Sequence, residues 1–255
     1  MRKPGGSTCC RKAPPMASGP KHREISGIIS YQIDGHPDFP DRTWGIERFH
    51  MTHHGDGHRV MRAYCELHDV ALTRDVVATV DADFHPHDTF VRLTKDNKFY
   101  GSTWYRWTDT EAEYQGFNVE RGRISETVEI DRNIRGFGTH NLTGDAWLAA
   151  RVDLTKGEGI QTFKNNLLSS IDHRGATGPD FQRTTTSSLQ YSGVETVTVP
   201  AGTFECYKFA FVMTSNDHPP YEFWVTTDGD FLFVKGTVAE PYNWTFELEE
   251  LNIIR

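Results

Sequence analysis

The residues best suited to chemistry lie in one central stretch of the chain, residues 132–183. His140 and Asp145 are close together in this stretch, and Asp172-His173-Arg174 follows them. A histidine near a carboxylate can act as a general base, and an arginine can stabilise developing negative charge. The pattern predicts a cofactor-independent acid–base site made of His140, Asp145, Asp172, His173 and Arg174. The alternative interpretation is an ordinary surface turn, because Asp-His-Arg runs are common there.

A second group of residues could hold a hydrophobic ligand. The predicted strands Lys98–Trp107 and Thr203–Met213 carry aromatic side chains on both faces. Such strands must be covered on both sides, by a core on one and by a helix, loop or ligand on the other. Rings with flat apolar faces and polar tips suit an aromatic or lipid-like ligand, although a thick core explains them as well. The candidate ligand-binding residues are Trp104, Tyr105, Trp147, Trp224, His50 and Tyr64.

Metal and cofactor sites are poorly supported by the sequence. His85-Pro86-His87 has the spacing that places two imidazoles on one strand face, but Phe90 and Val91 stand where a third ligand is expected. Zinc and iron sites need three or four convergent ligands. The sequence also has no phosphate-binding loop. We therefore predict no metal and no cofactor.

The elements that must position these residues are predicted to be β-strands at short, even intervals. Turn signals such as Gly55-Asp56-Gly57 and Pro200-Ala201-Gly202 separate them, and no helices intervene, which indicates an antiparallel meander. The predicted strands are Ile25–Ile33, Trp44–His53, His58–Asp69, Arg74–Ala82, Thr89–Lys95, Lys98–Trp107, Glu111–Val119, Arg121–Ile130, Thr184–Tyr191, Glu195–Val199, Thr203–Met213, Pro220–Thr227, Asp230–Val238 and Tyr242–Ile253.

The irregular central segment, residues 132–183, is predicted to contain one or two short helices, at Thr143–Asp153 and Ile160–Ile171. The predicted fold class is therefore all-β with one or two short helices. The strands are expected to form one domain, residues 25–255, as a large curved sheet or a lipocalin-like open barrel. Residues 1–24 are rich in Gly, Pro and basic side chains and are predicted to form a disordered tail.

Charge and composition restrict the choice of partner and compartment. Residues 1–24 hold six Lys/Arg and one acidic residue, about +5, so the remainder carries -8 - 5 = -13. An acidic body argues against nucleic-acid binding. The chain has no apolar run of membrane-spanning length and no signal-peptide core, and its four cysteines form no disulfide framework, so a cytoplasmic location is expected.

A resemblance to a known family rests on the C-terminal third of the chain. Val199–Phe204 reads V-P-A-G-T-F, a tryptophan-bearing strand follows at Glu222–Val225, and Glu247–Leu251 reads E-L-E-E-L. Residues 184–252 thus resemble a bacterial domain family of unknown function that is related in shape to lipocalin-like and lipoprotein-carrier-like open barrels. The resemblance implies such a barrel and brings no known catalytic residues.

Two functional hypotheses follow from these patterns. The first is a lyase, isomerase or hydratase that acts on a hydrophobic, aromatic small molecule by His/Asp proton transfer. The alternative is a non-catalytic carrier or sensor of such a ligand. Convergence of His140, Asp145, His173 and Arg174 at a pocket lined by Trp104 or Trp224 would favour the enzyme. The sequence predicts no oligomeric state.

Overall fold

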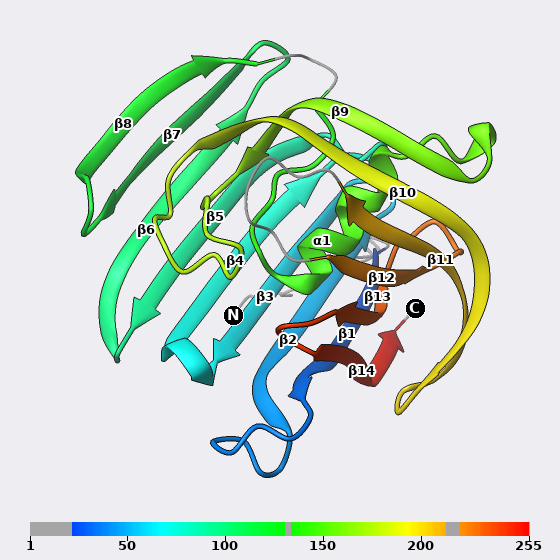
Figure 1. Cartoon of the computed structure of the whole chain (residues 1–255). Helices are drawn as coiled ribbons and strands as arrows, with labels where there is room; N and C mark the ends of the chain where they lie inside the picture. Colours follow the sequence, from blue (N-terminus) through cyan, green and yellow to red (C-terminus); the bar gives the residue numbers. More distant parts are fainter. Residues whose placement is uncertain (1–21, 131–133, 213–219, 255) are drawn as a thin grey trace, which may run out of the picture.

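The structure, a computed structural model, describes residues 22–130, 134–212 and 220–254, which form one antiparallel sheet (Figure 1). Its fourteen strands are β1 (His22–Ile33), β2 (Thr43–His54), β3 (Arg59–Leu67), β4 (Leu72–Val80), β5 (Pro86–Lys95), β6 (Lys98–Trp107), β7 (Glu111–Asn118), β8 (Gly122–Glu129), β9 (Gly159–Leu168), β10 (Gln182–Val199), β11 (Gly202–Val212), β12 (Tyr221–Thr226), β13 (Phe233–Val238) and β14 (Trp244–Ile254).

The sheet consists of two meanders joined by the first and last strands. The strand order is β8-β7-β6-β5-β4-β3-β2-β1-β14-β13-β12-β11-β10-β9, so each strand except β1 and β14 pairs only with its neighbours in sequence. β1 pairs with both β2 and β14, while β8 and β9 form the two edges. The sheet is therefore strongly curved but not closed into a barrel, in agreement with the predicted fold class.

Alternation along the strands sets the inner face of this curved sheet. Met51 on β2 pairs with Met61 on β3, and both are almost fully buried. Their neighbours His50 and Arg62 pair with each other on the more exposed face. Burial of one such apolar side chain stabilises the fold by roughly 1.5–3 kcal/mol, and a one-residue slip would expose the whole set, so this pattern fixes the register.

A short inner layer occupies the concave side of the sheet. The helix α1 (Leu142–Leu148) and the 3₁₀ turns Ala149–Arg151 and Leu154–Lys156 follow the first meander, and α1 lies inside the curve of the strands (Figure 1). Six of the seven residues of α1 are buried. The predicted helix at Thr143–Asp153 is thus confirmed, although its second half forms 3₁₀ turns.

The predicted helix at Ile160–Ile171 is wrong, because this segment forms the edge strand β9. Ile160, Phe163 and Leu167 have the spacing of a helix face, but β9 pairs with β10 along its length, from Gly159–Tyr191 to Leu168–Gln182. This ladder outweighs the local pattern. The predicted strands Thr184–Tyr191 and Glu195–Val199 are one strand, β10, with an irregularity between Tyr191 and Val194.

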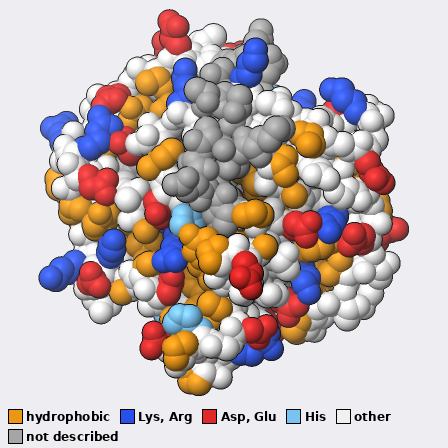
Figure 2. Space-filling model, viewed as in Figure 1, with side chains coloured by type: hydrophobic (Ala, Val, Ile, Leu, Met, Phe, Trp, Pro, Cys, Tyr) orange, Lys and Arg blue, Asp and Glu red, His pale blue; other side chains and the backbone are white. Residues whose placement is uncertain are grey.

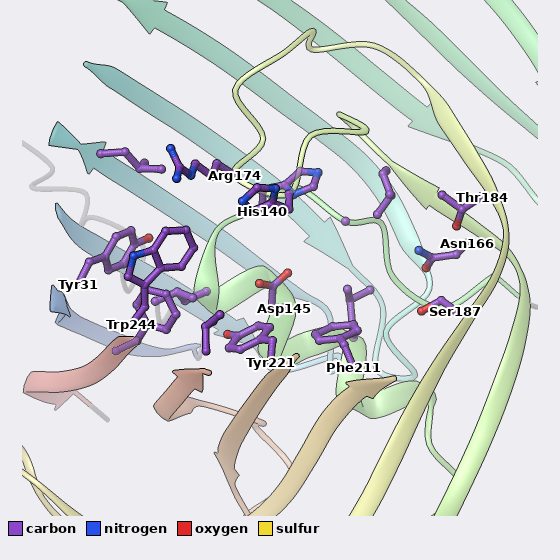
Figure 3. Close-up of a pocket in the computed structure, with 18 of the residues that line it drawn as sticks. Tyr31, His140, Asp145, Asn166, Arg174, Thr184, Ser187, Phe211, Tyr221 and Trp244 are labelled. Carbon is purple, nitrogen blue, oxygen red and sulfur yellow. The ribbon is translucent and has the colours of Figure 1, made fainter. Parts of the chain in front are cut away.

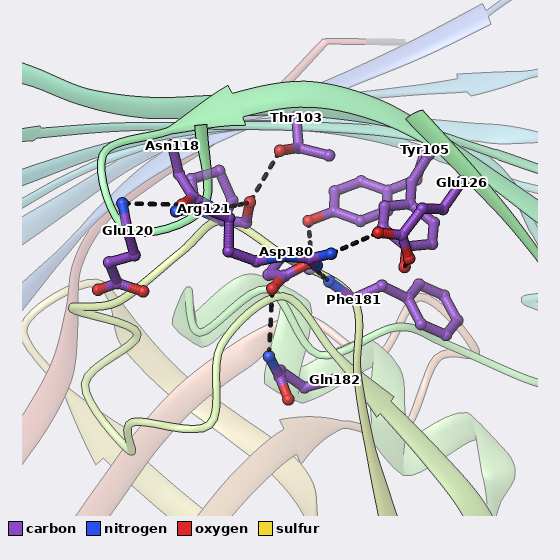
Figure 4. A network of polar contacts seen from close by, with 11 residues as sticks. Thr103, Tyr105, Asn118, Glu120, Arg121, Glu126, Asp180, Phe181 and Gln182 are labelled. Carbon is purple, nitrogen blue, oxygen red and sulfur yellow. Dashed lines mark hydrogen bonds and ion pairs between the residues drawn. The ribbon is translucent and has the colours of Figure 1, made fainter. Parts of the chain in front are cut away.

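A polar network fastens the loop before β10 to the first meander (Figure 4). The hydroxyl of Thr103 and the amide of Asn118 donate to the carbonyl oxygen of Pro179, at 2.8 and 3.2 Å. Arg121 forms an ion pair of 2.5 Å with Asp180, a carboxylate that is mostly buried. The loop before β10 is thus attached through its backbone to side chains of β6 and β7.

The described chain begins within the segment that was predicted to be a disordered tail. His22–Glu24, part of the predicted tail, are the first residues of β1, whereas residues 1–21 lie outside the described part.

On the face shown in Figure 2, basic and acidic side chains are interspersed. In the described part of the chain, no helix has the length and apolar character needed to cross a membrane.

Candidate functional site

A hollow lies between α1, the loops before β10 and the C-terminal meander (Figure 3). It is a cavity of about 110 Å³. Its walls are mainly aromatic and aliphatic, with a few polar side chains. The lining residues are Tyr31, Trp44, Leu67, Gly138, His140, Leu142, Asp145, Leu148, Asn166, Leu168, His173, Arg174, Thr184, Ser187, Phe211, Tyr221, Val238, Trp244 and Phe246.

Glu47, a fully buried carboxylate on β2, positions the helix that carries part of this wall. It accepts hydrogen bonds from the backbone N–H groups of Leu142 and Thr143, at 2.7 and 3.0 Å, and from the Thr143 hydroxyl at 2.6 Å. The Tyr31 hydroxyl also donates to it, at 2.9 Å. Negative charge is favourable at a helix N-terminus, so Glu47 fixes α1 and thereby places Asp145.

Arg74, a buried guanidinium on β4, positions the two loops beside the cavity. It donates hydrogen bonds to the backbone carbonyl oxygens of His140 and Arg174. Its side chain is almost completely buried, so these bonds replace the water that the charge would otherwise bind. One residue of the sheet therefore holds together the two loop segments that contain the predicted catalytic histidines.

Asp145 is the polar group that stands out on the cavity wall. Within the described residues its carboxyl has no hydrogen-bond or ion-pair partner, and it points into the cavity (Figure 3). Burial, followed by the negative charge of Glu47, raises the pKa of Asp145 to about 8, while Arg74 opposes this shift. Asp145 is therefore mostly protonated at neutral pH and can donate a hydrogen bond, or ionise opposite a cation.

The two predicted histidines both line the cavity but have different surroundings. The Nε2 atom of His140 lies 3.0 Å from the carbonyl oxygen of Ser170, so Nε2 carries the proton, because a carbonyl can only accept. The His173 ring packs against Tyr242 and Trp244, with centroids 5.4 and 6.2 Å apart. Burial lowers the pKa of His173, which keeps its imidazole neutral at neutral pH. Asp145 makes no hydrogen bond or ion pair with either ring among the described residues.

Arg174 and Asp172 have structural partners of their own. Arg174 forms an ion pair of 2.9 Å with Asp69 and lies over the Trp244 ring, 5.2 Å from its centroid. Asp172 accepts hydrogen bonds from the backbone N–H groups of Arg174 and Ala176, both at 3.0 Å, and stabilises the turn. Four of the five predicted catalytic residues thus line the cavity, whereas Asp172 does not.

The predicted ligand-binding residues lie elsewhere. Trp104 and Tyr64 are more than one-third exposed on the outer face of the sheet, and His50 lies on the same face. Trp224 donates from Nε1 to Glu195 at 2.9 Å, and its ring lies beside the ammonium of Lys208, 4.9 Å from Nζ. None of these residues lines the cavity.

Tyr105 and Trp147 are buried on the inner side but also lie outside the cavity. Tyr105 is a core residue whose hydroxyl donates to the backbone of Asp180. Trp147, on α1, packs edge-on against Phe84 at 5.9 Å and lines a smaller hollow of about 20 Å³.

The histidines considered for a metal site do not converge. His85 interacts with Asp81 at 3.0 Å, and His87 is exposed. Among the described residues, no group of three or more His, Cys, Asp or Glu side chains could hold a metal ion.

Sequence reasoning missed Glu47, Arg74 and most of the aromatic wall. A signal for the first two was present: each is a charged residue at an inward position of a strand whose other inward residues are apolar. No sequence signal identifies the aromatic wall, because it depends on which strands face α1 across the curve of the sheet.

Comparisons with known proteins support the fold. No protein-family model and no curated protein matches this sequence. The structure is similar to a solved β-barrel-like protein of domain of unknown function DUF1849 from Brucella abortus, with a TM-score of 0.50, 11% identity, and coverage of 92% of this chain and 98% of that one. A Bacteroides fragilis protein with a YmcC-like fold aligns at a TM-score of 0.29 and 9% identity, covering 91% and 95%. The first likeness shows a shared β-barrel-like fold.

Proposed function

We propose that this protein binds a small hydrophobic molecule in the cavity beside α1. The observation that carries the proposal is a cavity of about 110 Å³ with aromatic walls and one carboxyl that has no hydrogen-bond or ion-pair partner among the described residues. One water molecule needs roughly 10–15 Å³ of such space, so the cavity accommodates a ligand of about 7 to 11 non-hydrogen atoms. Apolar walls with a few convergent polar groups are typical of ligand sites.

A second set of polar groups lies across the cavity from Asp145 (Figure 3). Thr184 and Ser187 are buried residues of β10, and their hydroxyls have no hydrogen-bond partner in the described part of the chain. The neighbouring Asn166 accepts a hydrogen bond from Arg151 at 2.7 Å and keeps its amide N–H groups for other partners. A ligand with a polar group at each end can therefore satisfy both walls.

Binding without turnover is the function that this geometry supports best. The candidate acid–base residues form no dyad, because Asp145 makes no hydrogen bond or ion pair with His140 or His173, and Arg174 is paired with Asp69. A second candidate, a lyase or isomerase that uses Asp145 as general acid or base, is favoured by the pKa of that residue, about 8, since catalytic groups work best near the operating pH. We rank carrier or sensor first.

The protein family, the mode of ligand storage and the cellular location are also part of this proposal. The turn Pro200-Ala201, between β10 and β11, lies where the V-P-A-G-T-F signature predicts a hairpin. Membership in the bacterial family with this signature, a lipocalin-like mode of ligand storage and a cytoplasmic location are proposed on the sequence patterns alone.

The test is to fill the cavity and measure binding. Purified protein is examined by native mass spectrometry for a co-purified small molecule, and then by thermal shift with a library of neutral and charged fragments of up to twelve non-hydrogen atoms. Ser187→Phe places a ring in the cavity, whereas Ser102→Phe, on the outer face of β6, is the matched control. We expect ligand binding to the native protein and the control, and none to Ser187→Phe. Equal binding by both variants would refute the proposal.

A further inference from the structure

We infer that the ligand is a hydrophobic amine, bound as its ammonium form with the charge opposite Asp145. This inference rests on the proposed function and adds the chemical class of the ligand. It depends on the charges around the cavity, on the rings beside Asp145 and on the polar groups of the opposite wall.

Asp145 is the one acidic side chain on the cavity wall, and its carboxyl has no hydrogen-bond or ion-pair partner among the described residues. Arg174 is paired with Asp69, and the two histidines are a neutral ring, His173, and a ring hydrogen-bonded to a carbonyl, His140. The remaining fixed charges near Asp145 are Glu47, held at the N-terminus of α1, and Arg74, which is bound to loop carbonyls. An ionised Asp145 would therefore be a single uncompensated carboxylate.

A monocation restores this balance. A buried carboxylate without a partner is costly, and contact with an opposite charge lowers this cost. A neutral ligand leaves Asp145 protonated and uses only one hydrogen bond. An anionic ligand would instead add a second negative charge beside Glu47 and Asp145.

Two aromatic side chains of the cavity wall lie beside the carboxyl of Asp145 (Figure 3). Phe211 and Tyr221 lie beside Asp145 (Figure 3), and their rings are stacked with centroids 5.7 Å apart and an interplanar angle of 16°. The charge of Asp145 contributes to the raised pKa of Tyr221, after burial, which is consistent with their proximity. Ring faces attract cations through their quadrupole, so an ammonium beside Asp145 gains both an ion pair and cation–π contacts.

The rest of the cavity suits the body of such an amine. Trp44 and Trp244 have ring centroids 4.8 Å apart and form an apolar wall away from Asp145. The hydroxyls of Thr184 and Ser187, across the cavity from Asp145, supply partners for a polar group at the other end of the amine. The space excludes long-chain amines and admits a single ring with a short chain.

A pair of probes of equal size tests the inference. 2-Phenylethylamine and 2-phenylethanol differ in the group that would meet Asp145, and both fit the estimated size of the cavity. Isothermal titration calorimetry at pH 7 is run on the full chain, on Asp145→Asn and on Asp96→Asn. Asp96 is an exposed turn residue with φ 51°, a backbone conformation that Asn also tolerates, so this control removes a charge without strain.

We expect the amine to bind the native protein at least tenfold more tightly than the alcohol. Asp145→Asn should remove this preference and leave the alcohol unchanged, while Asp96→Asn should behave as the native protein. Amine binding should also release about one proton, measured from titrations in buffers of different ionisation enthalpy, because Asp145 ionises on binding.

The opposite results separate the two proposals. If the alcohol binds as tightly as the amine, or if Asp145→Asn leaves amine binding unchanged, the inference is wrong and the binding function stands. If neither probe nor any fragment of the library binds the native protein, the proposed function itself fails.

Discussion

Asp145→Asn should stabilise the folded protein at pH 8 but leave its stability nearly unchanged at pH 4. The unfolded chain ionises Asp145 above its ordinary pKa of 3.8, whereas the folded protein holds the proton until about pH 8. Between these values the folded state binds more protons, so this residue lowers the free energy of unfolding as the pH rises. Asparagine has nearly the same shape and does not ionise, so the variant escapes this loss.

The magnitude follows from the two pKa values. The interval from 3.8 to about 8 corresponds to about 6 kcal/mol at 1.36 kcal/mol for each tenfold change. The carboxyl borders a cavity that water can enter, and effective dielectric constants in proteins are closer to 20 than to 4, so about 2–3 kcal/mol is the realistic gain. For a chain of this size, that gain raises the melting temperature by roughly 4–12 °C.

Urea unfolding between pH 4 and pH 8 measures this effect. The difference in unfolding free energy between Asp145→Asn and the native protein should grow steadily over this range, while Asp96→Asn gives a flat, small difference. A constant difference at all pH values, or a variant that is less stable at pH 8, would show that Asp145 is already ionised and paired in the folded protein.

Three further predictions concern buried charged groups and buried thiols of the fold. Glu47→Gln should lower the free energy of unfolding by about 3 kcal/mol, because it weakens the charge-assisted cap of α1, whereas Glu66→Gln on the outer face should cost under 1 kcal/mol; both are measured by urea unfolding. Arg74→Met should release the two loop carbonyls and speed amide hydrogen exchange in residues 138–142 and 172–176 by at least tenfold. Cys65 and Cys206 should resist alkylation until the protein unfolds, because burial raises both thiol pKa values, that of Cys206 to about 12; rapid labelling of either of these two residues in the native protein, located by peptide mass spectrometry, would contradict this.

Local sequence patterns predict the strands that pair with their neighbours in the chain. Alternation and turn signals predict strands β1 to β8 to within a few residues, because each pairs with its neighbour in sequence. Prediction fails at β9, where Ile160 and Phe163 follow a helical spacing. Only the pairing with β10 makes this segment extended, and a pairing partner is not visible in a short window of sequence.

The site was less predictable than the fold, since it is made by the curvature of the whole sheet. Sequence proximity brought out His140, Asp145, His173 and Arg174, all of which line the cavity. The strand Lys98–Trp107 carries aromatic side chains on both faces, which points to Trp104 as well as Tyr105, but Trp104 lies on the exposed outer face. Which face of a strand lines the cavity depends on how the whole sheet curves, and the sequence of one strand does not show this.

The junction of the two meanders sets the order in which this protein can fold. Ile25 on β1 pairs with Ile253 on β14, a separation of 253 - 25 = 228 residues. Contacts of such long range form slowly, and until they form the first meander presents β1 as an open edge with unpaired backbone groups. Nascent chains should therefore pass through a long-lived half-sheet that is prone to self-association, so the yield of native protein should depend on chaperones and on the rate of synthesis more than on the final stability.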